Sequence, residues 1–213
     1  MTRCAILLLA VLAGCAPSQL PTLITSVAAH DYDVAPLFAR PYRDKLTRNA
    51  RVVWGMDAPL AIFGAQVEQE SAYRPLVQSK FANGIAQFTP ATAEWIGTKY
   101  EDLANPQPFN VDWSFRALAR YDHFLYRRVE DAYDDCERWA FTLAAYNGGE
   151  SWVRRDRAKA AVTGRDSRSY FGQVDTVTSG RGESFWRENT GYPLRILKIL
   201  HPQYVAWGRG ACT

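Results

Sequence analysis

The sequence predicts a mainly helical, all-α domain, and three kinds of observation support this prediction. From about residue 41 onward, apolar side chains recur every three to four residues, the period of an α-helix with one buried face. Few stretches alternate apolar and polar residues as a half-buried strand does. Helix-capping residues and helix-breaking glycines and prolines bound several of the periodic stretches. With 213 residues, 47% of them hydrophobic, the chain can form one domain with a sizeable core.

The first predicted helix begins after Asp57 and ends near Tyr73. Asp57 can accept a hydrogen bond from the first turn, and Pro59 is tolerated there because the first backbone N–H groups have no partner inside the helix. Pro75 disfavours continuation, because the residue before a proline avoids the helical conformation.

Two further helices follow. Thr89 and Pro90 are a cap and a first-turn residue, and they open a short helix that Gly97 can close. A longer helix is expected over about residues 111–129, because its apolar residues form one stripe. The members of that stripe are Val111, Phe115, Leu118, Leu125 and Val129.

The last two predicted helices lie in the C-terminal third. Asp134 or Asp135 can cap a helix that stops at the glycine pair beginning with Gly148. A final helix is expected over about residues 192–200, where Pro202 ends it.

The segment from Val153 to Arg181 is predicted to be a basic loop region. It contains seven Lys or Arg against three acidic residues, and glycines interrupt any helical period. Such a segment is either a solvated, mobile surface or a lip that meets an anionic substrate.

The N-terminus resembles a bacterial lipoprotein signal. Arg3 precedes an apolar run over residues 5–13 that is too short to span a bilayer but suits a secretory signal. The run ends in Leu-Ala-Gly-Cys, a lipobox-like string in which Cys15 is the expected site of lipid attachment. By resemblance to enterobacterial lipoprotein sorting, Ala16 rather than Asp at the next position favours the outer membrane. The alternative is a plain signal peptide that contains a cysteine.

This interpretation divides the chain into three parts. Residues 1–15 are the expected lipoprotein signal, residues 16–40 a proline-containing tether, and residues 41–213 the catalytic domain. The expected location is periplasmic, with a lipid anchor in the outer membrane or secretion by the same route. Cys136 and Cys212 then remain as an even pair in an oxidising compartment, and they form either a disulfide or two separate thiols.

Charge and composition exclude some partners. A net charge of +3 is too small to indicate nucleic acid, and it would not repel an anionic polymer such as peptidoglycan. No His or Cys cluster indicates a metal or cofactor, so none is expected. We expect a monomer.

Glu70 is the candidate catalytic residue. Within its predicted helix it follows Phe63 and Val67 at positions i, i+4 and i+7, so its carboxyl shares a face with apolar side chains. Burial and the negative end of the helix dipole both raise a carboxyl pKa, which suits a general acid. Helix position alone favours the alternative, a glutamate at the edge of the stripe whose carboxyl reaches water.

The surrounding motifs favour the catalytic interpretation. In order they are Glu70-Ser71-Ala72-Tyr73, Ser79, Gly84-Ile85-Ala86-Gln87, Thr89-Pro90-Ala91-Thr92-Ala93, Ala145-Tyr146-Asn147-Gly148-Gly149, and Glu188 with Tyr192. Over roughly residues 55–205 they resemble the motifs of lytic transglycosylases of the soluble, goose-lysozyme-like class. That resemblance implies a lysozyme-like helical domain that cleaves the MurNAc–GlcNAc bond of peptidoglycan.

The resemblance also assigns roles to individual residues. It makes Glu70 the acid and base. It counts Ser71, at the end of the active-site helix, and Ser79, near the reacting sugar, among the substrate-binding residues. Gln87, Tyr146 and Asn147 would face the substrate, and Tyr192 would place its hydroxyl near Glu70. For each of these residues packing or capping is the alternative, and for the two tyrosines a buried ring with a bonded hydroxyl fits equally.

Three departures from the family pattern stand out. Ala86 occupies the position of a usual methionine, which would remove one wall of a sugar subsite. Phe81-Ala82-Asn83 is one residue shorter than the common spacing, which makes the alignment of Ser79 less secure than that of Gln87. Asn189 replaces the threonine that follows the motif glutamate, and Pro193 follows Tyr192, so the entry to the last helix could be altered.

The mechanism implied by the resemblance needs one carboxyl. Glu70 would protonate the leaving oxygen and then deprotonate the MurNAc 6-hydroxyl, giving a 1,6-anhydro end. A hydrolysing lysozyme of the same fold is the first alternative, with Asp122 as the best second carboxylate. The second is a non-catalytic, peptidoglycan-binding lipoprotein.

Overall fold

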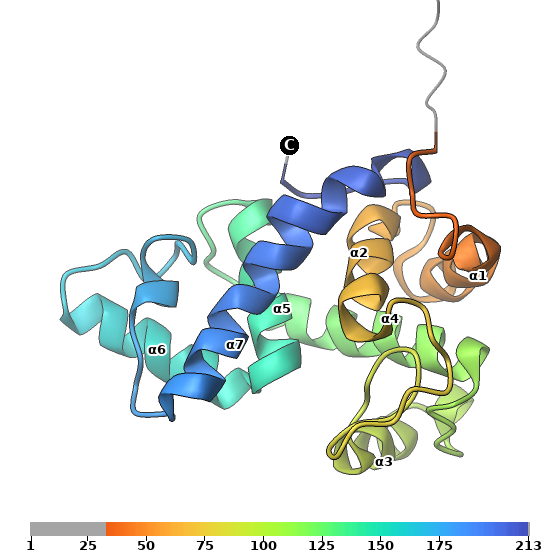
Figure 1. Ribbon diagram of the computed structural model, residues 1–213. Helices are drawn as coiled ribbons and strands as arrows, with labels where there is room; N and C mark the ends of the chain where they lie inside the picture. The colour runs from red at the N-terminus through yellow and green to blue at the C-terminus, as the bar shows by residue number, and fades with distance from the viewer. Residues whose placement is uncertain (1–32, 213) are drawn as a thin grey trace, which may run out of the picture. The chain divides into compact units, whose positions relative to one another are not determined.

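The computed structural model describes residues 33–212 (Figure 1). The expected signal, the lipid-attachment residue Cys15 and most of the expected tether lie outside the described residues. Within residues 33–212 there are helices and no strands, apart from two isolated bridges that involve Asn83, so the predicted all-α class is confirmed. In this part of the chain no helix combines the length and the apolar character needed to cross a bilayer.

Seven α-helices make up the described domain. Their bounds are α1 Arg43–Trp54, α2 Leu60–Ser71, α3 Pro90–Lys99, α4 Val111–Arg127, α5 Asp135–Gly148, α6 Glu150–Val162 and α7 Glu183–Leu194. A π-helix over Arg195–Leu200 continues α7, and short 3-10 turns follow it.

Helix α2 is the central element of the core. It is apolar on nearly all sides, and residues 60–67 are all buried, which is the pattern of a helix surrounded by others. It packs against α1, the π-helix and the last 3-10 turns, while α7 runs beside α5 (Figure 1). At Gly64 a Cβ atom would lie 2.4 Å from the Tyr204 ring, so only glycine permits this close packing.

Two predicted helix starts, those of α3 and α5, are confirmed, and in both a side chain caps the first turn. The Thr89 hydroxyl accepts from the Thr92 backbone N–H at 3.1 Å, and Asp134 accepts from the Glu137 N–H at 2.8 Å. The prediction for Asp57 is wrong, because α2 begins after Pro59 without a side-chain cap. Gly97 does not end α3, which continues to Lys99.

Helix α7 begins nine residues earlier than the sequence indicates. It starts at Glu183 and contains Pro193, which has no backbone N–H to donate to the carbonyl of Asn189 one turn before it. The Tyr170 hydroxyl donates to that carbonyl at 3.4 Å instead. This contact explains how a proline is accommodated inside the helix.

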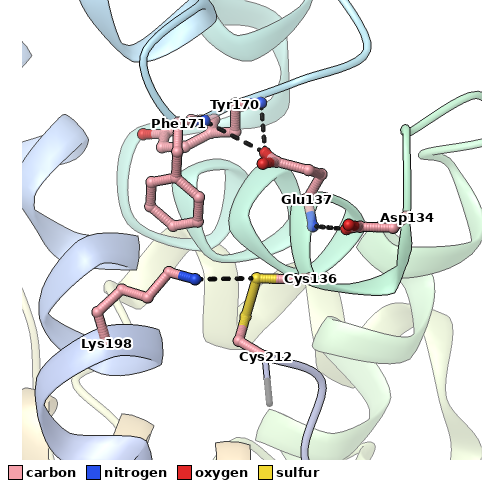
Figure 2. The surroundings of a disulfide bond; sticks show 7 residues. All are labelled: Asp134, Cys136, Glu137, Tyr170, Phe171, Lys198 and Cys212. Carbon is pink, nitrogen blue, oxygen red and sulfur yellow. Dashed lines mark hydrogen bonds between the residues drawn. A yellow bond between two sulfur atoms is a disulfide. The ribbon is translucent and has the colours of Figure 1, made fainter.

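The prediction of a basic loop over residues 153–181 is wrong for its first third, which is helix α6. Residues 163–181 form the predicted loop, apart from a 3-10 turn over Val174–Thr176. Tyr170 is buried, and the Glu137 carboxylate accepts from the backbone N–H groups of Tyr170 and Phe171 (Figure 2). Arg157 also donates to the Ser167 carbonyl at 2.7 Å, so the segment is bonded to the helical core.

Both ends of the described chain are fixed to the domain. Residues 33–40, predicted as the end of the tether, bury Ala35 and Ala39, and Trp207 donates its ring N–H to Asp33 at 3.1 Å. Cys136, in the first turn of α5, forms a disulfide with Cys212 (Figure 2). The C-terminal tail is therefore held at the start of α5.

Candidate active site

A cleft of about 590 Å³ opens where the end of α2 meets the loop over residues 72–89, the end of α5 and helix α7. Glu70 lies in its lining, as do most of the residues singled out in the sequence. The other lining residues are Gln69, Ser79, Phe81, Ala82, Gln87, Phe88, Thr89, Thr92, Tyr121, Tyr146, Asn147, Arg187, Glu188, Gly191, Tyr192 and Arg195.

Glu70 occupies the last turn of α2, where its carboxyl accepts a hydrogen bond from the Tyr192 hydroxyl. Desolvation raises the pKa of Glu70 to about 8, the Tyr192 bond opposes that rise, and the negative charge of Glu188 adds to it. A carboxyl with this pKa is mostly protonated at neutral pH. It can therefore donate a proton to a ligand in the cleft.

Tyr146 and Tyr192 form one wall beside Glu70. Their rings are parallel within 6°, with centroids 6.5 Å apart, so α5 and α7 present a common aromatic surface. The Tyr146 hydroxyl donates to the Ala86 carbonyl at 2.7 Å. This bond connects α5 to the loop on the other side of the cleft.

The loop over residues 72–89 is fixed from below by Ser71. Its buried hydroxyl donates to the Ile85 carbonyl at 2.8 Å, and Ser71 is not among the residues that line the cleft. The assignment of Ser71 to substrate contact is therefore wrong, and its role is to position the loop. Ala86, which stands at the position of the family's usual methionine, is also buried. Its side chain does not line the cleft.

Gln87 and Ser79 lie on the cleft side of this loop. Gln87 has a left-handed backbone conformation with a φ of 47°, and its amide nitrogen donates to the Gly84 carbonyl at 2.8 Å. That bond leaves the side-chain oxygen as the acceptor for a ligand. The Ser79 hydroxyl accepts from the Ala82 backbone N–H at 2.9 Å, which holds the tip of the loop.

Gly84 explains how the loop approaches the rest of the domain. Its φ is 76°, and a Cβ atom at this position would lie 1.6 Å from the Pro108 carbonyl oxygen. Only glycine fits there.

Asn147 lies at the exposed rim of the cleft, one residue before the end of α5. Its side-chain oxygen accepts from the Asn189 amide at 3.2 Å, and that amide also donates to the Ala144 carbonyl at 2.7 Å. Asn189, noted in the sequence only as a departure from the family pattern, therefore sets the position of Asn147. Gly148 permits this packing, because a Cβ atom there would lie 2.3 Å from the Asn189 nitrogen.

Asp122 does not line the cleft. It is fully buried on α4, and burial raises its pKa well above the ordinary value, an effect that the Gln66 amide opposes and the Glu70 carboxylate reinforces. A carboxyl held neutral and away from the cleft lining is poorly placed to activate a water molecule beside the substrate.

Three residues of the cleft lining near the C-terminus are not predicted by the sequence. Arg187 and Gly191 lie on α7, Arg195 begins the π-helix that continues it, and all three line the cleft with Glu188 and Tyr192. Arg187 and Gly191 precede Tyr192, where the last helix is predicted to begin, so the face that they share with Glu188 and Tyr192 is not apparent. Arg195 follows Tyr192 by one turn within the predicted helix, and this spacing could have identified it. Among residues 33–212, no group of three or more His, Cys, Asp or Glu is placed to hold a metal ion.

Comparison with known proteins supports the resemblance. The family described as "Transglycosylase SLT domain" matches residues 54–168, which include Glu70, the loop over residues 72–89, and Tyr146. The chain belongs to this family. The family assignment also supports the lysozyme-like form of the all-α fold.

Three proteins named "Membrane-bound lytic murein transglycosylase F" are similar to the chain. The protein of Maricaulis maris is 31% identical over 146 residues, which cover 66% of this chain and 30% of that protein. The protein of Desulfosudis oleivorans is 28% identical over 163 residues, covering 76% and 33%, and that of Aliivibrio fischeri is 26% identical over 164 residues, covering 76% and 32%. The chain thus spans about a third of the length of these relatives.

Proposed function

We propose that this family member is a peptidoglycan lytic transglycosylase that cleaves the MurNAc–GlcNAc bond with Glu70 as its acid and base. The observation that carries the proposal is the Glu70 carboxyl itself. It lines a cleft, its pKa is raised to about 8, and a tyrosine hydroxyl orients it. The names of the three relatives, lytic murein transglycosylases, agree with this class of activity.

The proposed reaction proceeds in two steps. Glu70 gives its proton to the glycosidic oxygen as the bond between that oxygen and the MurNAc anomeric carbon breaks. The N-acetyl oxygen of the same sugar stabilises the anomeric carbon. The Glu70 carboxylate then takes the proton from the 6-hydroxyl as that oxygen bonds to the anomeric carbon, which yields a 1,6-anhydro ring and restores the acid.

Hydrolysis is the second candidate, and one observation favours it. Glu188 also lines the cleft and is exposed, so a second carboxylate is available to hold an attacking water molecule. Asp122 is a weaker candidate for that role because it is buried outside the cleft lining.

Digestion of purified sacculi tests the proposal. We expect soluble muropeptides whose MurNAc ends have the mass of the 1,6-anhydro form, and a Glu70→Gln variant with native circular dichroism that releases none. Glu188→Gln is the comparison variant: its loss of charge should lower the Glu70 pKa, but it should still give 1,6-anhydro ends, because the proposed reaction passes no proton through Glu188. Reducing MurNAc ends, lost in Glu188→Gln, would establish hydrolysis instead, and full release by Glu70→Gln would remove Glu70 from the mechanism.

We also propose that Cys15 carries the lipid that holds the protein at the outer membrane from its periplasmic side. The supporting features are the apolar run and the Leu-Ala-Gly-Cys string in the sequence. Labelling with a radioactive fatty acid should modify the full chain and not a Cys15→Ser variant. Equal labelling of the two proteins would refute the anchor.

A further inference from the structure

A hollow of about 680 Å³ lies on the exposed face of α6, and none of the residues that line it also lines the catalytic cleft. The charged members of its lining are Arg154, Arg155, Arg157 and Asp131. Three guanidinium groups against one carboxylate leave two positive charges in excess. This arginine hollow therefore attracts an anionic ligand.

The arginine hollow is built along one side of a helix. Its lining residues at positions 151, 154, 155, 158 and 161 follow the three- and four-residue spacing of a single helical face. Ala158 and Ala161 continue this face beyond the arginines, and their small side chains leave room for a ligand to lie along the helix. The opposite face of α6 is buried against the rest of the domain.

Arg157 and Asp131 form a fixed wall of the hollow. The Arg157 Nε donates to the Ser167 carbonyl at 2.7 Å, and a terminal nitrogen donates to Asp131 Oδ1 at 2.5 Å. The Arg157 side chain is only 17% exposed, whereas that of Asp131 is 67% exposed. Arg157 bonds only one of the two Asp131 oxygens, so within residues 33–212 the other is able to accept from the amino group of a ligand.

Arg154 and Arg155 supply the guanidinium groups for an anion. Both residues are exposed, and within residues 33–212 neither forms an ion pair. The Arg155 guanidinium lies over the Trp152 ring, 3.7 Å from its centroid, and its Nε donates to the Ser151 carbonyl at 3.1 Å. These contacts hold Arg155 in place and leave its two terminal nitrogens for a carboxylate, which guanidinium groups bind through paired hydrogen bonds.

The arrangement of charges fits a peptide that carries both a carboxylate and an amino group. A carboxylate has a single charge and matches the guanidinium groups, whereas Asp131 would repel a doubly charged phosphate more strongly. None of the described residues that line the hollow is aromatic, so it offers no ring for a sugar face. The stem peptides of peptidoglycan carry free carboxylates and amino groups.

The arginine hollow lies within reach of a strand bound at Glu70. Ser151 lines the hollow, Asn147 lines the cleft, and four residues of chain separate them, so their Cα atoms are at most about 14 Å apart. An extended peptide of roughly four residues spans the same distance. A stem peptide on a strand in the cleft is therefore long enough to enter the hollow.

We propose that the arginine hollow binds the stem peptide of the glycan strand held in the cleft, with Arg154 and Arg155 on a peptide carboxylate and Asp131 on an amino group. This inference rests on the proposed function for the identity of the polymer. It implies that strands carrying stem peptides bind more tightly than bare strands of the same length.

The test measures binding separately from cleavage. Glycan strands of one length, with and without their stem peptides, are titrated calorimetrically into the inactive Glu70→Gln protein. We expect the peptide-bearing strands to bind about tenfold more tightly. Adding Arg154→Ala and Arg155→Ala together should remove most of that advantage and leave the affinity for bare strands unchanged. Both side chains are exposed, so the melting temperature should stay that of the parent protein.

The matched control is the pair Arg48→Ala, Arg51→Ala. It removes the same charge from exposed positions of α1 that line neither the arginine hollow nor the cleft, so the advantage of the peptide-bearing strands should persist. A second arm changes the ligand instead of the protein. Amidation of the stem-peptide carboxylates should abolish the advantage, and acetylation of the peptide amino groups should reduce it, because Asp131 then has no ammonium to accept from.

The remaining outcomes separate the site from the reaction. Equal affinities for peptide-bearing and bare strands, or an equal loss in the α1 control, would overturn the arginine hollow as a peptide site. Inorganic phosphate that displaces the peptide-bearing strands as well as free stem peptide does would make the hollow a general anion site and overturn the proposal. If the strands bind as expected but the wild-type protein cleaves none, the proposed function fails while the peptide site stands.

Discussion

The hydroxyl of Tyr192 on α7 donates a hydrogen bond to the carboxyl of Glu70, which lies 122 residues earlier in the chain at the end of α2. The bond joins α2, which carries the candidate acid, to α7, which forms part of the cleft wall. It also opposes the rise in the Glu70 pKa that burial produces, because a hydrogen bond to a carboxylate stabilises the charged form.

Removing this hydroxyl should change the pH dependence of the reaction. In the wild-type protein the general acid is lost as Glu70 ionises, so we expect activity to fall as pH rises through about 8. Tyr192→Phe removes the bond that lowers the Glu70 pKa, so the alkaline limb of the kcat/KM profile, which reports the free enzyme, should move to higher pH. The rate below the limb should fall about tenfold or more, since a hydrogen bond to a charged group contributes about 1.5–3 kcal/mol.

Tyr146→Phe is the control for that experiment. It also removes one tyrosine hydroxyl from the cleft wall, but this hydroxyl donates to the Ala86 carbonyl and not to Glu70. We expect the alkaline limb to stay in place. A limb that moves equally in both variants would mean that the Tyr192 bond does not set the Glu70 pKa.

Asp122 should make stability fall as pH rises. Burial raises the folded-state pKa of Asp122 well above the ordinary value of 3.8. Below pH 3.8 the carboxyl is protonated in both the folded and the unfolded chain, so the free energy of unfolding carries no penalty from its ionisation there. At higher pH the unfolded chain ionises while the folded carboxyl keeps its proton, so stability declines until the pH passes the folded-state pKa. Asp122→Asn copies the neutral form and removes this decline.

We therefore expect Asp122→Asn to raise the melting temperature at pH 8 by a few degrees relative to its effect at pH 4, since 1 kcal/mol shifts the midpoint by about 2–4 °C at this size. Asp102→Asn is the control of opposite sign. Burial acts to raise the pKa of Asp102, but hydrogen bonds from Arg120 and Arg116 outweigh it and the net shift is downward. Asp102→Asn should therefore lower the melting temperature near neutral pH. Parallel melting curves for wild type and Asp122→Asn at every pH would contradict the burial of an ionisable group.

The sequence predicts the cleft better than it predicts the segment over residues 163–182, and the difference has a physical cause. Glu70 and its motifs lie on helices with a clear apolar period, so its face could be read from positions 63, 67 and 70. The segment over residues 163–182 has no period. Its shape depends on contacts such as the Glu137 carboxylate with the Tyr170 backbone, which join distant parts of the chain.

The start of α7 was missed for a related reason. Gly182 precedes it without a side-chain cap, and Pro193 lies inside it, so local signals argue against a helix. The helix forms because Tyr192 and Asn189 are buried against the core and because Tyr170 bonds the carbonyl that the proline leaves free. Tertiary contacts thus override the local sequence signal.

The disulfide should contribute to stability without shaping the site. Cys136 and Cys212 are separated by 76 positions, and closing a loop of that length stabilises the fold by roughly 4 kcal/mol in the loop-entropy description. The Cys136→Ser, Cys212→Ser double variant should therefore melt about 10 °C lower. Because the bond lies in the first turn of α5 and Asn147 near its end, kcat at 25 °C should be unchanged. A loss of activity without a loss of stability would show that the bond acts on the cleft.

Gly148→Ala tests the contact that fixes the rim of the cleft. The added methyl group would lie 2.3 Å from the Asn189 nitrogen, so Asn189 must move and release Asn147 and the Ala144 carbonyl. We expect a loss of about 1–3 kcal/mol in urea unfolding, the usual effect of buried polar groups left without partners, together with a lower kcat/KM.

Gly191→Ala provides the comparison for that variant. Gly191 lies inside α7 with nothing within 4 Å of an added Cβ, so the same chemical change should be neutral or should stabilise the helix by up to about 1 kcal/mol. Equal unfolding free energies for the two variants would show that Asn189 adapts without loss. In that case Asn147 would not depend on Asn189 for its position at the rim of the cleft.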